Sequence, residues 1–110
     1  MKSVVSIRRC GGYETDHLAL TLERVLGDLG GAHSFFRRGD QVLLKPNLLA
    51  SASPERALVT HPAFVEAVAT MVIDCGATPF LGDSPPLGKL SRVLTKSGYD
   101  PFMKRLGVQP

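Results

Sequence analysis

The sequence predicts an α/β fold in which helices cover both sides of a mainly parallel, Rossmann-like sheet. Strand-like apolar segments alternate with helical segments along the 110 residues, and this alternation is typical of parallel strands joined by right-handed crossovers. The segment QVLLKP at 41–46 is apolar at successive positions, as in a strand buried on both faces. The length allows a single domain, 1–110, with one modest core. The predicted order of elements is βαβαβαα.

The first third of the chain predicts a strand, a turn and a helix. The β-branched run SVVSIR at 3–8 predicts the first strand, and the glycine-containing stretch 10–12 predicts the turn after it. In the helix that follows, Thr15 or Asp16 is the expected N-cap and Gly30 the expected end. Apolar residues with helical spacing share one face of it: Leu18, Leu22, Val25, Leu26 and Leu29.

The middle of the chain predicts the second strand and the clearest helix. The strand covers 41–46, and the connection 47–60 is long enough to suggest a functional loop. The helix covers 61–76, because Pro62 suits a first turn and Gly76 suits a helix end. The predicted buried face of this helix consists of Phe64, Val65, Val68, Met71, Val72 and Cys75.

The last third predicts a short strand and two short helices. TPFLG at 78–82 predicts the third strand, and KLSRVLTKSG at 89–98 predicts a helix that ends at a glycine. DPFMKRLG at 100–107 predicts a further short helix with Asp100 as its cap. The closing VQP resembles the first residues of another element.

The composition argues against several classes of partner. The net charge is +3, but basic residues form no run longer than two and no stripe interleaved with aromatic residues, so we expect no nucleic-acid binding. A mild positive charge suits small anions. No apolar run approaches the roughly 20 residues that span a bilayer. The start of the sequence has too short an apolar stretch for a secretory signal, and we expect a cytoplasmic protein without a membrane segment.

The two cysteines, Cys10 and Cys75, form no metal-binding pair in the sequence. They stand 65 positions apart, without CxxC or CxxH spacing, so no zinc or iron–sulfur site is encoded here and no metal ligand is assigned. In the predicted topology they lie at opposite edges of the sheet, and we therefore expect no disulfide between them.

Polar residues and glycines follow each predicted strand. Because parallel strands end at one edge of the sheet, and ligands of open α/β sheets bind at that edge, we expect these residues to form a site. The candidates for ligand binding are Gly11, Gly12, Asn47, Thr60, Gly82 and Ser84. The N–H groups at the start of the helix after Thr60 also suit an anion.

Three further residues at this edge are candidates for catalysis: Lys45, His61 and Asp83. Lys45 could neutralise a phosphate or carboxylate, or act as a base if desolvated. His61 could act as a general acid or base, because its ordinary pKa lies near neutrality. Asp83 could bind a metal or a hydroxyl group. The sequence contains neither GxGxxG nor GxxxxGK[ST], so a standard nucleotide site is not supported.

Each of these candidates also has a purely structural interpretation. Lys45 could extend into solvent at a strand end, and His61 before Pro62 could serve only to begin a helix. Asp83 and Ser84, which precede two prolines, could form a turn with their own backbone. These alternatives stay open at the level of the sequence.

Three spaced motifs give the chain a family resemblance. KPN at 45–47, THP at 60–62 and GDSP at 82–85 resemble segments of the family called domain of unknown function 362. The stretch 97–108 is also similar to that family. The resemblance implies no known activity. It implies that the chain is the N-terminal part of a larger domain or a small relative, because family members are usually longer.

The resemblance also bears on cofactors and partners. The family that this chain resembles has many members with ferredoxin-type 4Fe–4S segments closer to the C-terminus. This chain contains no run of cysteines that could ligate such a cluster. We therefore assign no iron–sulfur cluster to it and leave the cofactor unknown. The resemblance implies docking to a ferredoxin-like part, and a three-stranded sheet with open edges suggests self-association.

Two functions fit these observations, and a third, nucleic-acid binding, is kept only because the chain is basic. The first is an enzyme, or part of one, that binds a small anionic ligand at the carboxyl edge of the sheet. The second is a non-catalytic scaffold that docks an iron–sulfur electron-transfer module or another protein partner. The sequence does not identify a reaction or a substrate.

Overall fold

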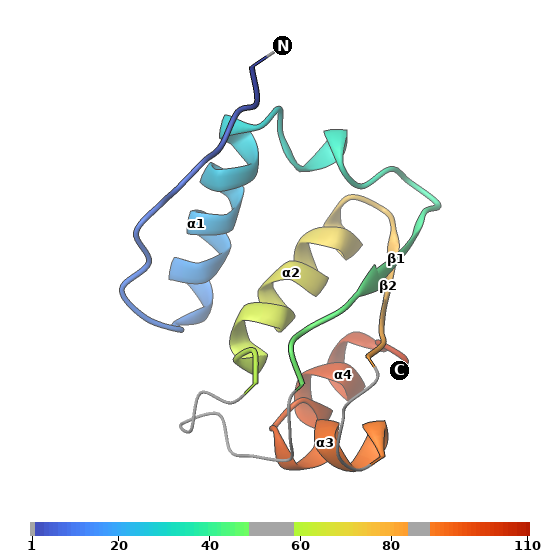
Figure 1. Ribbon diagram of the computed structural model, residues 1–110. Coiled ribbons are helices and arrows are strands. Elements are labelled where there is room, and N and C mark those ends of the chain that lie inside the picture. The colour runs from blue at the N-terminus through green and yellow to red at the C-terminus, as the bar shows by residue number, and fades with distance from the viewer. Residues whose placement is uncertain (1, 49–58, 84–88) are drawn as a thin grey trace.

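The computed structural model describes residues 2–48, 59–83 and 89–110 (Figure 1). In these ranges the helices and strands appear in the order that the sequence predicts from its first helix onward. They are α1 (Thr15–Asp28), the short 3-10 helix η1 (Ala32–Ser34), β1 (Gln41–Leu44), α2 (Pro62–Asp74), β2 (Thr78–Leu81), α3 (Leu90–Lys96) and α4 (Asp100–Leu106).

The centre of the fold is a parallel β–α–β unit. β1 and β2 pair in parallel with the register Gln41 to Thr78 and Leu44 to Leu81, and α2 connects them. This confirms the α/β class. The residues after α4 extend the pairing on the other side of β2, because the N–H of Leu81 donates to the carbonyl of Gln109 at 2.8 Å.

Helix α2 begins and ends where the sequence predicts. Pro62 fixes the first turn without loss of a helical hydrogen bond. At this position of a helix the backbone N–H of any residue lacks an acceptor within the helix, so the N–H that proline lacks is not missed. After the C-cap, Gly76 adopts φ +84°, a conformation that glycine reaches without the Cβ strain of other residues. This turn reverses the chain from α2 into β2.

The first predicted strand is wrong. Residues 2–10 contain no helix or strand and run along the outer side of α1 (Figure 1). Asp28 at the end of α1 holds them, since it accepts hydrogen bonds from Ser6 at 2.7 Å and from Arg8 at 2.7 and 2.8 Å. A β-branched run favours extended backbone, but a strand also needs a neighbouring strand to pair with, and this segment lies against a helix instead.

The expected three-layer arrangement is not confirmed. Helix α1 packs mainly against α2, and α2 packs on one face of the two strands (Figure 1). Leu43 of β1 is 53% exposed. In the described ranges α2 is the helix with extensive contacts to both strands, so a second layer of helices over the sheet is not found.

The core lies where α2 meets the carboxyl ends of the strands and the two C-terminal helices. Tyr99 is fully buried there, and its hydroxyl donates to the carbonyl of Thr60 just before α2. The other core residues are Leu48, Val59, Val65, Ala69, Leu81, Val93, Leu94, Phe102, Met103 and Val108. The core thus supports the same edge of the sheet at which the sequence predicts a site.

The predicted buried face of α2 is confirmed at Val65, Val72 and Cys75, which are buried. Val68 and Met71 are only partly buried, and Phe64 is 39% exposed. Ala67 and Ala69 are buried as well, and Ala67 shares a groove with Ala19 of α1. Small side chains on that flank let α1 approach α2, which the apolar spacing of larger residues did not reveal.

Candidate functional site

Two hydrogen bonds join the end of β1 to the start of α2. The N–H of Asn47 donates to the hydroxyl oxygen of Thr60 at 2.9 Å, and the N–H of Thr60 donates to the carbonyl of Asn47 at 2.8 Å. Next to them, Leu48 and Val59 form an antiparallel bridge, and both are buried. The structure therefore brings Asn47 and Thr60 together at the predicted edge.

The end of β2 lies beside the end of β1. The N–H of Gly82 donates to the carbonyl of Leu44 at 3.1 Å, which continues the strand pairing by one residue. Lys45 and Asp83 each follow directly, Lys45 exposed and Asp83 partly buried. A cation and a carboxylate thus leave neighbouring strands at the same edge.

His61 is the N-cap of α2. Its Nδ1 accepts a hydrogen bond from the N–H of Ala63 at 3.1 Å, and the ring of Tyr13 stacks on it with a centroid distance of 3.8 Å. Because Nδ1 is an acceptor, the neutral ring carries its proton on Nε2. His61 in this arrangement offers a hydrogen-bond donor to a ligand, and a proton-accepting role at Nε2 would require it to give up the cap.

The predicted anion site on the N–H groups of α2 is wrong. Pro62 has no N–H, the N–H of Ala63 is bonded to the His61 side chain, and the N–H of Phe64 donates to the His61 carbonyl at 3.1 Å. The motif THP therefore satisfies the first turn of its own helix. An anion at this edge would have to use side chains instead.

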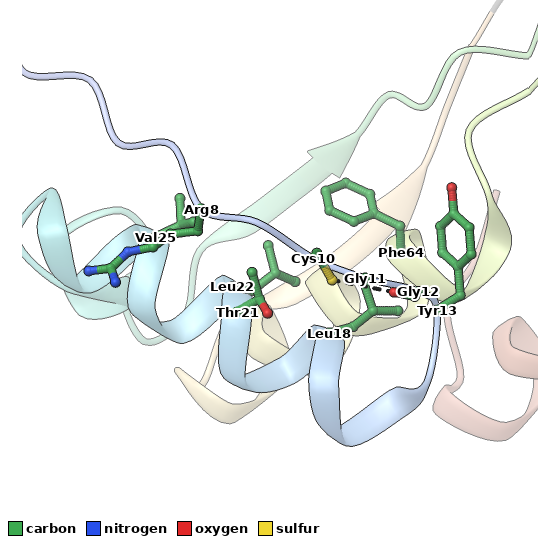
Figure 2. Close-up of a pocket in the computed structure, with 10 residues that line it drawn as sticks. All are labelled: Arg8, Cys10, Gly11, Gly12, Tyr13, Leu18, Thr21, Leu22, Val25 and Phe64. Atoms are coloured by element: carbon green, nitrogen blue, oxygen red, sulfur yellow. Dashed lines mark hydrogen bonds between the residues drawn. The ribbon is translucent and has the colours of Figure 1, made fainter.

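A pocket of about 470 Å³ lies between residues 8–13, helix α1 and the start of α2 (Figure 2). Gly11 and Gly12 form part of its wall, and the thiol of Cys10 donates to the carbonyl of Gly12 at 3.3 Å. The opposite wall is largely apolar and comes from α1: Leu18, Leu22 and Val25. The volume lies within the range of small-molecule sites.

Phe64 connects this pocket to the strand ends. Its ring borders the 470 Å³ pocket and also a second hollow of about 200 Å³ that Lys45 lines. Tyr13 borders the larger pocket and stacks on His61. The sequence analysis missed both aromatic residues, although Tyr13 directly follows the two glycines and Phe64 lies in the first turn after THP.

Asp28 holds the outer wall of the pocket in place. The hydrogen bonds from Arg8 and Ser6 lower the pKa of Asp28 to about 2. The same contact raises the pKa of Arg8. The guanidinium of Arg8 donates two hydrogen bonds to this carboxylate. The positive charge at the Arg8 end of the pocket is therefore already neutralised by Asp28.

The structure thus gathers most of the predicted site residues at one edge. Gly11 and Gly12 line the larger pocket, Lys45 lines the smaller one, and the remaining described candidates lie between α2 and the strand ends: Asn47, Thr60, His61, Gly82 and Asp83. Ser84 lies outside the described residues.

Three further features concern the cysteines, metal ligands and membrane-spanning helices. Both thiols are free, with Cys10 exposed and Cys75 buried. Across the ranges that the structure describes, no three His, Cys, Asp or Glu side chains are grouped so that they could hold a metal ion. None of the helices described has both the length and the apolar character needed to cross a membrane.

Comparison with known proteins identifies the family. Residues 42–110 match the family model described as domain of unknown function (DUF362). The chain is also 42% identical over 108 residues to the thylakoid-associated protein sll1697 of Synechocystis sp., an alignment that covers 98% of this chain and 34% of that protein. No solved structure matches the chain. The chain belongs to the domain of unknown function 362 family and spans about a third of the length of this curated relative.

Proposed function

We propose that this member of the domain of unknown function 362 family binds a small anionic ligand at the carboxyl edge of its parallel sheet, as part of an enzyme. The observation that carries the proposal is the joining of the three family motifs. The bonds between Asn47 and Thr60, and between Leu44 and Gly82, bring KPN, THP and the start of GDSP to one place. Motifs that meet at a ligand-binding edge favour a shared site over three separate turns.

Lys45 supplies the positive charge of the proposed site. Its side chain is exposed and lines the 200 Å³ hollow beside the apolar ring of Phe64. An exposed ammonium group at the rim of a hollow can pair with a phosphate or carboxylate that enters it. The net charge of +3 adds a favourable long-range field.

His61 and Asp83 give the site its polar specificity. With its Nδ1 used by the cap, His61 presents Nε2–H as a donor, which suits an anion. Asp83 repels an anion and therefore suits a hydroxyl or an ammonium group elsewhere on the ligand, or a proton-transfer role. Asn47 adds a side-chain amide. Thr60 adds a hydroxyl that can donate its proton to a ligand, since its oxygen already accepts a hydrogen bond from the N–H of Asn47.

The test is a thermal-shift titration with inorganic phosphate, malonate, citrate and adenosine monophosphate. At 100 times its dissociation constant, a ligand stabilises the folded state by about 2.7 kcal/mol. We expect at least one of these anions to raise the Tm of the wild type and of Lys96→Ala, a matched loss of an exposed lysine on α3. The same anion should not raise the Tm of Lys45→Ala. Equal shifts in all three proteins, or no shift with any anion, would contradict the proposal.

A scaffold that docks a protein partner is the second candidate, and exposed apolar side chains favour it. Val4, Val5 and Ile7 are 71%, 78% and 89% exposed, and Leu43 in β1 is 53% exposed. A ferredoxin-like part or a second copy of the chain would bury such residues. Gel filtration with light scattering across a hundredfold concentration range would detect self-association.

The location of the protein stays a prediction. The sequence suggests a cytoplasmic protein, whereas the name of the Synechocystis relative describes that protein as thylakoid-associated.

A further inference from the structure

Gly11 and Gly12 are glycines that the described protein itself does not require. Neither has a positive φ, and a Cβ built on either would meet no atom within 4 Å. By contrast, Gly76 has φ +84° and a Cβ there would lie 3.3 Å from the side chain of Arg38. Neither backbone conformation nor packing against the described residues calls for glycine at these two positions, and the bare backbone leaves room for the close approach of a ligand.

The space beside these glycines has a distinct chemical character. Leu18, Leu22 and Val25 form an apolar wall across from the glycine backbone, and the rings of Phe64 and Tyr13 stand at the end of the pocket away from Arg8 (Figure 2). Arg8 is paired with Asp28, so that end offers no free cation. The pocket suits a flat, uncharged group that lies on bare backbone on one side and on aliphatic side chains on the other.

We propose that the ligand of this edge is a ring-bearing anion, whose aromatic ring occupies the 470 Å³ pocket against Gly11 and Gly12 and whose anionic group reaches Lys45. This proposal rests on the proposed function, because the anionic end is the one assigned above. Phe64 borders both the 470 Å³ pocket and the 200 Å³ hollow that Lys45 lines. A single ligand that extends past the side chain of Phe64 can therefore contact the larger pocket and Lys45. The chemical class is an aryl phosphate or an aryl carboxylate.

The test compares phenyl phosphate with inorganic phosphate by isothermal titration calorimetry. We expect phenyl phosphate to bind the wild type at least about tenfold more tightly than inorganic phosphate, because the ring loses apolar surface to water. In Gly12→Ala the added methyl group takes ring space, so the affinity for phenyl phosphate should fall to within about twofold of the affinity of the same variant for inorganic phosphate. Gly12→Ala should fold normally, since nothing lies within 4 Å of its new Cβ.

Gly27→Ala is the matched control. It also adds a methyl group where no atom lies within 4 Å, but in α1 beside the other groove, and it should keep the full preference for phenyl phosphate. Inorganic phosphate binding without a preference for phenyl phosphate would overturn this inference and leave the proposed function standing. Binding of neither would overturn this inference, and the proposed function would also fail if malonate, citrate and adenosine monophosphate left the Tm unchanged. A preference that survives Gly12→Ala would also overturn the inference, because the ring would then lie elsewhere.

Discussion

Replacement of Tyr99 by Phe removes one hydroxyl that joins the C-terminal helices to the candidate site. Tyr99 is fully buried, and its hydroxyl donates to the carbonyl of Thr60, the residue that pairs with Asn47. The ring itself packs against Phe102 at a centroid distance of 5.6 Å, and phenylalanine keeps that contact. The variant therefore isolates the hydrogen bond from the packing.

The expected loss of stability follows from that single bond. A net hydrogen bond contributes about 1 kcal/mol, and a carbonyl left without its partner in a partly buried place raises the cost to about 1–2 kcal/mol. For a domain of this length, each kcal/mol corresponds to a Tm change of about 4 °C. Tyr99→Phe should therefore melt about 4–8 °C below the wild type at neutral pH.

The pH dependence provides a second, independent signature. Burial raises the pKa of Tyr99 above its usual value, because the charged phenolate is poorly solvated in the core. The folded state thus holds the proton more tightly than the unfolded chain. This contribution is complete below the unfolded pKa near 10 and is lost above it, by up to about 1.4 kcal/mol per pH unit. Wild-type stability should fall more steeply than that of Tyr99→Phe as the pH rises past about 10.

The assay is urea unfolding of both proteins at a series of pH values, with Tyr13→Phe as control. The Tyr13 side chain is 56% exposed, so loss of its hydroxyl should change stability by less than about 0.5 kcal/mol. If Tyr99→Phe is as stable as the wild type at neutral pH, the hydroxyl does not hold Thr60. If the two proteins lose stability in parallel above pH about 10, Tyr99 does not titrate from a buried position.

Two further predictions concern a buried hydroxyl and the N-terminal segment. Ser97 is fully buried and its hydroxyl has no hydrogen-bond partner among the described residues; Ser97→Ala should raise stability by about 1 kcal/mol in urea unfolding, and a loss would reveal a missed partner. Asp28→Asn weakens the contact with Arg8, so trypsin should cut at Arg8 faster, and an unchanged rate would contradict the contact. In the wild type this contact is fully present above the usual pKa of Asp28 and is lost only as the pH falls through about 2.

The successes of the sequence analysis share one physical basis. The boundaries of α2 follow from Pro62 and Gly76, which act on the backbone within a residue or two. β1 and β2 follow from short apolar runs between turns, and the end of α4 follows from Gly107, whose φ is +70°. Such signals depend on neighbours in sequence, so they can be read without the fold.

The failures have a different basis. Residues 3–8 have the composition of a strand, but pairing requires an edge from elsewhere in the chain, and Asp28 binds the segment beside α1 instead. Phe64 has the spacing of a buried residue, yet its exposure depends on what lies opposite the first turn of α2. No pattern along the chain carries that information.

The candidate site divides in the same way. The sequence by itself determined that polar residues follow the segments of β1 and β2, and the parallel connection of these two strands places those residues at one edge. Only the tertiary structure decided that His61 uses Nδ1 to cap its own helix, that Tyr13 stacks on it, and that Gly11 and Gly12 border an apolar pocket. Periodicity and turn residues act over a few positions, whereas a ring stack or a pocket wall depends on segments that meet only when the chain is folded.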